Sequence, residues 1–288
     1  MITVNSLSGG RTSSYMAVHY PADVNLFACV EIEDRRATPK DAKLVQMCSD
    51  KLRHEFIATA EDNRTLTVMF ELEQIIGKEI KWLSERTYDS LFRERHLFGG
   101  IPNRLPSWAR RYCTVELKVI PIFKYCFLNL LQSETDRVKM RIGYRIDEPH
   151  RKVTFFENDN ERLKFPIACK NYLQKRQIKK IFHWREAEFP LMDDQVTNFD
   201  VIRFWRDKHL VFPPQSNCAG CFHKYEVSLN LQWQEAPAQM QWFADQEKLN
   251  KGTWLDNGLK YDRIKDMQFT MPIDFEIAGV SCSGGCTD

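Results

Sequence analysis

Short apolar runs alternate with helical periodicities over the first half of the chain. Residues 2–7 carry apolar side chains at Ile2, Val4 and Leu7 and run into Ser8-Gly9-Gly10, which predicts a strand that ends in a tight loop. Residues 85–112 are rich in Arg, Gly and Pro and are expected to form loops. Because strands and helices alternate from the start, we expect an α/β fold with a parallel sheet and flanking helices. The other expected strands are residues 24–32, 55–59 and 138–143, and the expected helices are residues 12–19, 38–52, 66–80 and 115–131.

In the second half of the chain this alternation gives way to longer helical patterns. Residues 198–210 have apolar side chains at helical spacing, and residues 228–250 do the same with an interruption near Pro237. The end of the chain has no regular period. We therefore expect an α/β domain over residues 1–150, and a mostly helical region over residues 151–288 that ends in a cysteine-containing tail.

The overall composition favours no class of partner. The 288 residues include 41 basic and 39 acidic side chains, and the resulting net charge of +2 indicates neither a nucleic acid nor an acidic or basic partner. Residues 170–185 form a local basic run with aromatic side chains, which suits either a nucleic-acid backbone or a solvated helix face. The first residues lack the features of a secretory signal, and no window has the roughly 20 apolar residues that span a bilayer. We expect a cytoplasmic protein without a membrane partner, whose nine cysteines are reduced.

The loop between the first strand and the first helix is suited to an anion. Adjacent glycines allow positive φ angles and a close approach of backbone to a phosphate, and the helix that follows presents free N–H groups. Hydroxyl groups and the guanidinium of Arg11 add hydrogen bonds and charge. The loop is neither a Walker A motif nor a dinucleotide fingerprint, since its glycines are adjacent and no Gly-Lys-Ser/Thr follows. A tight turn without a ligand would have a similar sequence.

Four segments together resemble the PP-loop superfamily, and within it the phosphoadenosine phosphosulfate reductases. SLSGGRTSS at residues 6–14 is similar to the PP-loop of N-type ATP pyrophosphatases and these reductases. Residues 110–122 resemble the reductases' Arg-x-x-Cys-Cys-x-x-x-Lys-x-x-Pro-Leu segment, and residues 143–148 resemble their Gly-x-Arg-x-Asp-Glu segment. Pro190-Leu191 and the residues after it resemble a later segment, so the likeness extends in the same order over residues 1–225.

The resemblance implies a Rossmann-like fold of the adenine nucleotide alpha-hydrolase type, in which the loop grips the pyrophosphate of ATP or the phosphosulfate of an adenylyl sulfate. Arg145 and Lys118 are the expected catalytic cations, because guanidinium and ammonium groups suit phosphate and sulfate oxygens. An acidic neighbour of Arg145 could position a ribose or Mg²⁺, or could hold the arginine in place; the alternative for each charge is a weak surface ion pair. The expected nucleotide-binding residues are Ser8, Gly9, Gly10, Arg11, Thr12, Ser13, Gly143, Asp147, Glu148 and Arg151.

The cysteines allow more than one kind of site. Cys218-Ala219-Gly220-Cys221 has the spacing of a metal ligand pair, and either zinc or an iron–sulfur cluster takes four such thiolates. In the reductase family a Cys-Cys pair and a later Cys-x-x-Cys bind a 4Fe–4S cluster, whereas here the pair is Cys113-Thr114 and one ligand is missing. The resemblance therefore implies a 4Fe–4S cluster, with zinc as the alternative. Its expected ligands are Cys113, Cys218, Cys221 and Cys286, with Cys282 as another candidate for the fourth position.

The cysteine-containing tail allows a second role. Many reductases of this family carry a nucleophilic tail cysteine, and Cys282 and Cys286 match it in position although the surrounding residues differ. Gly284 and Gly285 would let the tail fold over the site. Both tail cysteines are therefore candidate catalytic residues. The remaining cysteines with apolar neighbours, Cys29, Cys48, Cys126 and Cys169, are expected to be packed core residues.

Three functions are compatible with these features. In the first, ATP and Mg²⁺ adenylate a nucleic acid or small molecule, and sulfur then displaces AMP. In the second, a tail thiol reduces an adenylyl sulfate, and sulfite is released with the help of a thioredoxin-type partner. In the third, the chain is a non-catalytic nucleotide-binding regulator with structural zinc. The missing cluster cysteine and the altered tail favour the first, and the oligomeric state, including a homodimer, is left open.

Overall fold

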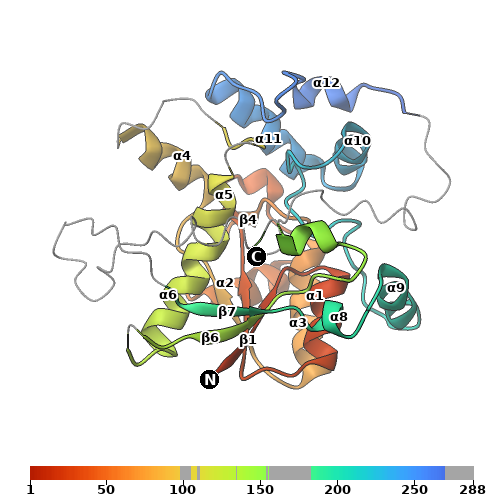
Figure 1. Cartoon of the computed structure of the whole chain (residues 1–288). Helices are drawn as coiled ribbons and strands as arrows, with labels where there is room; N and C mark the ends of the chain where they lie inside the picture. Colours follow the sequence, from red (N-terminus) through yellow and green to blue (C-terminus); the bar gives the residue numbers. More distant parts are fainter. Residues whose placement is uncertain (98–104, 109–110, 134, 154, 156–182, 270–288) are drawn as a thin grey trace.

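A parallel β-sheet forms the centre of the molecule (Figure 1). The computed structural model describes residues 1–97, 105–108, 111–133, 135–153, 155 and 183–269. The sheet has five strands in the order β5-β2-β1-β6-β7, and every neighbouring pair is parallel. These strands are β1 (Thr3–Leu7), β2 (Val24–Ala28), β5 (Ile80–Leu83), β6 (Val138–Arg141) and β7 (Arg185–Glu188). The predicted α/β class with a parallel sheet is confirmed.

The strand order places a switch point beside the central strand. From β1 the chain runs outward to β2 and β5, and it then returns to place β6 and β7 on the other side of β1. Val4 of β1 is in register with Val24 of β2 on one side and with Met140 of β6 on the other. In open parallel sheets, ligands bind at the carboxyl ends of the strands beside such a reversal. The edge above β1 and β6 is therefore the first place to look for a site.

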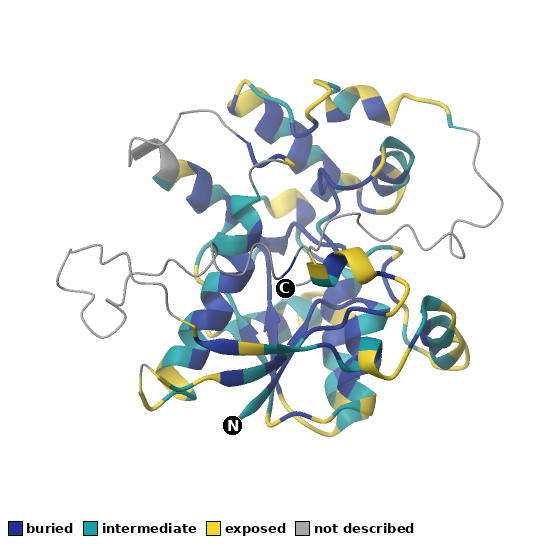
Figure 2. Ribbon diagram, viewed as in Figure 1, coloured by how far each residue is buried: buried dark blue, intermediate teal, exposed yellow. Residues whose placement is uncertain are grey.

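Helices cover both faces of the sheet, and the strands between them are mainly buried (Figure 2). On one face, Met16, Cys48 and Leu66 belong to one apolar cluster with Phe27 of β2. On the other face, Phe123 belongs to a separate cluster with residues of β1 and β2. Both faces of β1 and β2 thus exclude water, and the polar side chains of Asn5 and Asn25 are buried between them, where the amide N–H of Asn5 donates to Asn25 at 3.1 Å. The helices of the first face are α1 (Arg11–His19), α2 (Ala42–Leu52) and α3 (Arg64–Ile76), and α6 (Ile120–Asn129) covers the second.

Several predicted boundaries are wrong for identifiable reasons. Residues 24–32 do not form one strand: β2 ends at Ala28, and β3 (Glu31–Ile32) pairs with β4 (Ala58–Thr59) in a separate antiparallel sheet. The helix expected from Thr38-Pro39 begins only at Ala42, because the side chain of Asp41 accepts the N–H of Lys43 and caps it. The helix expected to reach residue 80 ends at Ile76, before Gly77 with a φ of +61°.

The loop expected over residues 85–112 contains a helix, α4 (Tyr88–Leu97). After it, the predicted helix over residues 115–131 has a composite form: α5 (Tyr112–Thr114), a π-helical turn η2 (Val115–Val119) and then α6. Pro121 comes directly after the π-helical turn, inside the continuous helical stretch 112–129, where its missing N–H interrupts the regular i→i−4 hydrogen bonds. Single π-helical turns are often found at functional sites.

The last three helices, α10 (Glu226–Glu235), α11 (Pro237–Leu249) and α12 (Tyr261–Lys265), lie above the carboxyl edge of the sheet (Figure 1). The interruption expected at Pro237 is confirmed, since Pro237 begins a new helix. The predicted boundary at residue 150 stays a prediction, and β7, which lies beyond it, pairs with β6 in the same sheet. None of the helices in the described ranges combines the length and the apolar character needed to cross a bilayer. Two shorter helices, α8 (Pro190–Asp193) and α9 (Asn198–Arg206), come between β7 and α10, and α9 packs against α1 through Phe204 and Tyr15.

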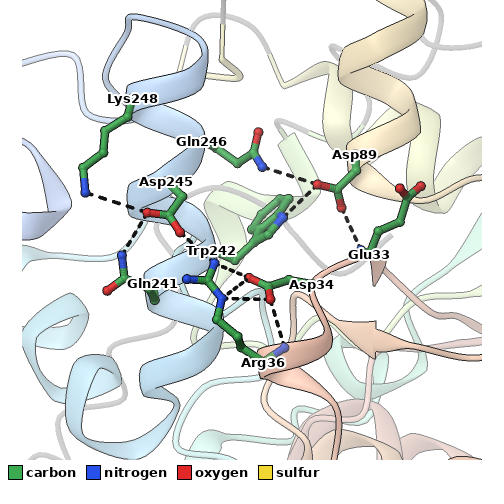
Figure 3. A network of polar contacts seen from close by, with 9 residues as sticks. All are labelled: Glu33, Asp34, Arg36, Asp89, Gln241, Trp242, Asp245, Gln246 and Lys248. Atoms are coloured by element: carbon green, nitrogen blue, oxygen red, sulfur yellow. Dashed lines mark hydrogen bonds and ion pairs between the residues drawn. The ribbon is translucent and has the colours of Figure 1, made fainter.

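A polar network attaches α11 to the first half of the chain (Figure 3). The guanidinium of Arg36, from the 3₁₀ helix η1 (Arg35–Ala37), donates to Asp245 of α11 at 2.7 Å. Asp89 of α4 accepts from the indole N–H of Trp242 at 2.9 Å and from the backbone N–H of Glu33 at 2.8 Å. Burial nevertheless raises the pKa of Asp89, because desolvation of the carboxylate outweighs these donors.

This raised pKa predicts a pH-dependent stability difference between the wild type and Asp89→Asn. The unfolded chain ionises Asp89 near pH 4, whereas the folded chain keeps the proton to higher pH. The free energy of unfolding of the wild type, minus that of Asp89→Asn, should therefore fall as pH rises from about 4 through the raised pKa, and then level off. Urea unfolding of both proteins across this range measures it. A difference that grows with pH would contradict the assignment.

Candidate functional site

The glycine loop after β1 is in close contact with two other segments. Gly9 has a φ of +74°, and a Cβ at this position would overlap with Cγ2 of Thr65 at the start of α3. A Cβ on Gly10 would lie 2.5 Å from Cβ of Ser216, in the segment that precedes the Cys-x-x-Cys. Real Cβ atoms do not approach so closely, so both positions require glycine. The loop is therefore held between α3 and the cysteine segment.

Hydroxyl groups stabilise this loop from inside. The Ser13 hydroxyl accepts the backbone N–H of Ser8 at 3.2 Å, donates to the carbonyl of Gly10 at 3.2 Å and lies 3.1 Å from the Ser8 hydroxyl. Gly10 is the N-cap of α1, and within the described ranges no side chain caps its first turn. The start of α1, at the positive end of the helix dipole, is therefore suited to an anion.

The loop after β6 meets the glycine loop at the switch point. A Cβ on Gly143 would lie 3.3 Å from Cα of Ser13, so the two backbones are in near contact. Two residues further on, Arg145 is buried and donates to the hydroxyl of Thr12 at 2.9 Å. The structure therefore brings the two predicted motifs together, although 133 positions separate Thr12 from Arg145 in the sequence.

Asp147 and Glu148 fix the position of Arg145. The Nε of Arg145 donates to Asp147 at 3.0 Å, and its Nη1 lies 3.3 Å from a Glu148 oxygen. The other Glu148 oxygen accepts from Arg151 at 3.0 Å, and the Arg151 guanidinium also lies 4.2 Å above the Tyr144 ring. Among the roles open to the two acids, the contacts support that of orienting the arginines. The guanidinium of Arg145 is thereby preorganised beside the glycine loop.

Arg11 and Lys118 occupy different parts of this edge. The carbonyl of Arg11 accepts the indole N–H of Trp205 at 3.0 Å, and its guanidinium lies 5.8 Å from the Phe212 ring. Lys118 is in the π-helical turn and is only 9% exposed. Its ammonium donates to Oε1 of Glu61 at 2.9 Å, and Glu61 is fully buried. A buried ion pair of this kind is costly to desolvate and restrains both side chains.

The Cys-x-x-Cys segment forms a tight turn beside the same edge. The N–H of Cys221 donates to the carbonyl of Cys218 at 3.0 Å, and the N–H of Ala219 donates to Ala60 at 2.8 Å. Gly220 packs directly against the ring of Phe243, where a Cβ would overlap with the ring carbons, and its carbonyl accepts from the Tyr261 hydroxyl at 3.0 Å. Backbone bonds and an aromatic cluster thus fix both thiols next to the β4–α3 segment.

Two buried tyrosines lie near the three candidate metal-binding cysteines of the described ranges. Burial raises the pKa of Tyr88, and the nearby thiols of Cys113 and Cys218 raise it further. Burial also raises the pKa of Tyr261, with contributions from Cys221 and Cys218. Cys113 and Cys218 pack against the apolar cluster that contains both tyrosines. In the described ranges, however, no three His, Cys, Asp or Glu side chains are arranged to hold a metal ion.

The predictions for the other cysteines and for the basic run over residues 170–185 are tested only in part by the structure. Cys29, Cys48 and Cys126 are buried, as predicted. Cys169, Cys282 and Cys286 lie outside the described residues, as does most of the basic run over residues 170–185. The described end of that run, Arg185, is buried in β7 with its guanidinium 4.9 Å from the Phe155 ring and 5.0 Å from the Trp184 ring, so it is not part of a solvated helix face.

Sequence reasoning missed the residues that connect the motifs. Glu61, Thr65 and Ser216 were not predicted, yet each contacts a predicted residue. The available signal was position: Glu61 comes two residues after β4, and Ser216 comes two residues before Cys218. Polar residues at the carboxyl ends of strands are typical of binding sites, and the predicted strand over residues 55–59 contains β4, but nothing in the sequence shows that Glu61 after it pairs with Lys118.

The Arg145–Glu148–Arg151 cluster predicts a large stability effect. Glu148→Ala leaves two buried guanidinium groups without their shared carboxylate, and the free energy of unfolding should fall by about 3–5 kcal/mol. Asp147→Ala removes a carboxylate that is 40% exposed and should cost less than about 1 kcal/mol. Urea denaturation distinguishes the two. Equal losses would show that Glu148 is not the organising group.

Comparison with known proteins gave no relatives for this site: no family model matches the chain, and no curated protein or solved structure matches it.

Proposed function

We propose that the chain is a PP-loop enzyme similar to phosphoadenosine phosphosulfate reductases, which binds ATP or an adenylyl sulfate and performs sulfur chemistry. The domain around the sheet would be Rossmann-like, of the adenine nucleotide alpha-hydrolase type. The observation that carries the proposal is the convergence at the switch point: the uncapped start of α1, the backbone at Gly143 and the oriented guanidinium of Arg145 meet at one edge. These three groups together suit the linked oxyanions of a nucleotide.

Sulfur chemistry is supported by the position of the cysteine segment. Ser216 packs on Gly10 of the loop, and Ala219 is hydrogen-bonded to Ala60, so Cys218 and Cys221 adjoin the nucleotide loop. Thiolates are the donors that iron–sulfur clusters prefer, and a Cys-x-x-Cys with small middle residues suits one. We propose a 4Fe–4S cluster held by Cys113, Cys218 and Cys221, with Cys286 as the fourth ligand; zinc is the alternative. Such a cluster would supply electrons or bound sulfur.

For the reaction, we favour ATP-dependent sulfur insertion. An oxygen of the acceptor, a nucleic acid or a small molecule, attacks the α-phosphorus of ATP, and pyrophosphate leaves with Mg²⁺. A sulfur nucleophile then forms a C–S bond at the activated carbon, and the C–O bond breaks with release of AMP. In this scheme the α1 terminus and Arg145 hold the phosphates and stabilise the charge that develops on them. The missing second cysteine at Thr114 favours this scheme over reduction.

Product analysis separates this scheme from its alternatives. Purified protein should bind ATP in calorimetry and release AMP and pyrophosphate when its acceptor is present. Sulfite release from phosphoadenosine phosphosulfate, with a thioredoxin-type reductant and without ATP turnover, would instead establish the reductase, with Cys282 or Cys286 as nucleophile. Binding without any turnover would favour a regulator, and no binding of either nucleotide would end the proposal.

The loop geometry predicts the effect of one methyl group on nucleotide binding. Gly9→Ala introduces a left-handed strain of about 1–2 kcal/mol and an overlap with Thr65, so the affinity for nucleotide should fall at least about tenfold. Gly77→Ala is a matched control, because Gly77 also has a positive φ but a Cβ there meets no atom within 4 Å. Calorimetry on folded proteins measures both. Equal affinity in the two variants would place the nucleotide elsewhere.

The cysteine arrangement predicts which substitutions remove iron. Anaerobically purified wild type should be brown, with absorbance near about 400 nm, and contain about four iron atoms per chain. Cys218→Ser, Cys221→Ser and Cys113→Ser should each lose most of this iron, whereas Cys126→Ala, in the buried core, should keep it. Metal analysis by mass spectrometry provides the readout. A colourless wild type with stoichiometric zinc would refute the cluster.

A further inference from the structure

One carboxylate oxygen of Glu61 is buried without a hydrogen-bond partner in the described ranges. Its side chain is fully buried, and Oε1 accepts from the ammonium of Lys118 at 2.9 Å. Oε2 is also buried, and in the described part of the chain it has no hydrogen-bond partner. A buried ionised oxygen without a donor is strongly unfavourable, so such an atom indicates a donor that is not part of these residues.

The position of Glu61 links it to both halves of the candidate site. It lies between β4 and α3: the preceding residue, Ala60, accepts the N–H of Ala219, and Thr65 in the next turn packs on Gly9. Burial raises the pKa of the Cys29 thiol, and the nearby carboxylates of Glu31 and Glu61 raise it further. The N–H of Ala60 donates to the carbonyl of Val30, two residues after β2, at 2.9 Å, so Glu61 lies close to the carboxyl end of β2.

Two other residues near the glycine loop also have buried polar atoms without a hydrogen-bond partner in the described ranges. The hydroxyl of Thr65, which packs on Gly9, has no hydrogen-bond partner in the described ranges. The same is true of both amide atoms of Asn217, which follows the Ser216 that packs on Gly10. Because Gly9 and Gly10 are adjacent, Thr65 and the residue before Asn217 contact one loop, and Glu61 precedes Thr65 by four positions. Unpaired buried polar groups concentrated in this way are typical of a ligand subsite.

The chemistry of the free oxygen restricts what it can bind. A carboxylate oxygen accepts hydrogen bonds only, and the proton donors of an adenine nucleotide are its ribose hydroxyls and its 6-amino group. Lys118 neutralises the charge of Glu61, so the carboxylate does not repel nearby phosphates. Acidic side chains that accept from a ribose hydroxyl are a recurrent feature of nucleotide sites in parallel sheets.

We infer that Glu61 is a nucleotide-binding residue, whose Oε2 accepts a hydrogen bond from a ribose hydroxyl while Lys118 holds Oε1. This inference rests on the proposed function, since it requires a nucleotide at the glycine loop. It makes the site selective for ribonucleotides over deoxynucleotides. It also gives Lys118 a positioning role through Glu61.

A cycle of one substitution and three ligand changes tests the inference. Calorimetry would compare wild type and Glu61→Gln with ATP, 2′-deoxyATP, 3′-deoxyATP and inosine triphosphate. Wild type should bind one of the deoxy analogues about tenfold or more weakly than ATP, because the buried oxygen then lacks its donor. Glu61→Gln should bind ATP about as weakly as wild type binds that analogue, and should no longer distinguish the two.

Controls separate the inference from general damage to the loop. Asp62→Asn alters the next buried carboxylate, which pairs with Arg64, and should retain the discrimination of the wild type. Should Glu61→Gln not fold, Glu61→Asp keeps the charge beside Lys118 but shortens its reach, and should also lose discrimination.

Other outcomes would overturn the inference in distinct ways. If the penalties of Glu61→Gln and of the deoxy analogue add, the carboxylate does not contact the ribose. If inosine triphosphate alone binds weakly to wild type, the donor is the 6-amino group and the ribose assignment is wrong. A wild type that binds no nucleotide would refute the proposed function as well, whereas one that binds all four equally would refute only this inference.

Discussion

The close packing of the glycine loop is the constraint on which the candidate site depends. Gly9 has no room for a side chain against Thr65, and Gly10 has none against Ser216. These contacts bring the start of α1, the start of α3 and the segment before Cys218 to one point above the central strand. A larger residue at either glycine would separate the three segments, and with them the anion-binding backbone from the thiols.

Charge at this edge is balanced in pairs. Arg145 is oriented by Asp147 and Glu148, and Lys118 is paired with Glu61. Buried cations of this kind are fixed in position before any ligand arrives, and a preorganised cation stabilises an oxyanion more effectively than a mobile one. The arrangement therefore favours precise orientation of a phosphate over simple attraction of negative charge, which agrees with the near-zero net charge of the chain.

The sequence predicted the elements with strong local signals. Strand β1, the loop at Gly9 and Gly10 and the strand before Gly143 were found because each strand has spaced apolar residues and is followed by glycine. Strand β5 was missed because only Ile80 and Trp82 alternate in a polar context, and residues of α4 were assigned to a loop. Glu61 could not be predicted, since its importance depends on the tertiary contact with Lys118. Long-range pairing, not local propensity, defines that part of the site.

The central claim is that the phosphates of an adenine nucleotide lie between the start of α1 and Gly143. A crystal structure of the protein with bound ATP tests it most directly. The account predicts phosphate oxygens within hydrogen-bond distance of the first N–H groups of α1 and of the Arg145 guanidinium. Electron density for the nucleotide at any other place, with the glycine loop closed on itself, would contradict the account.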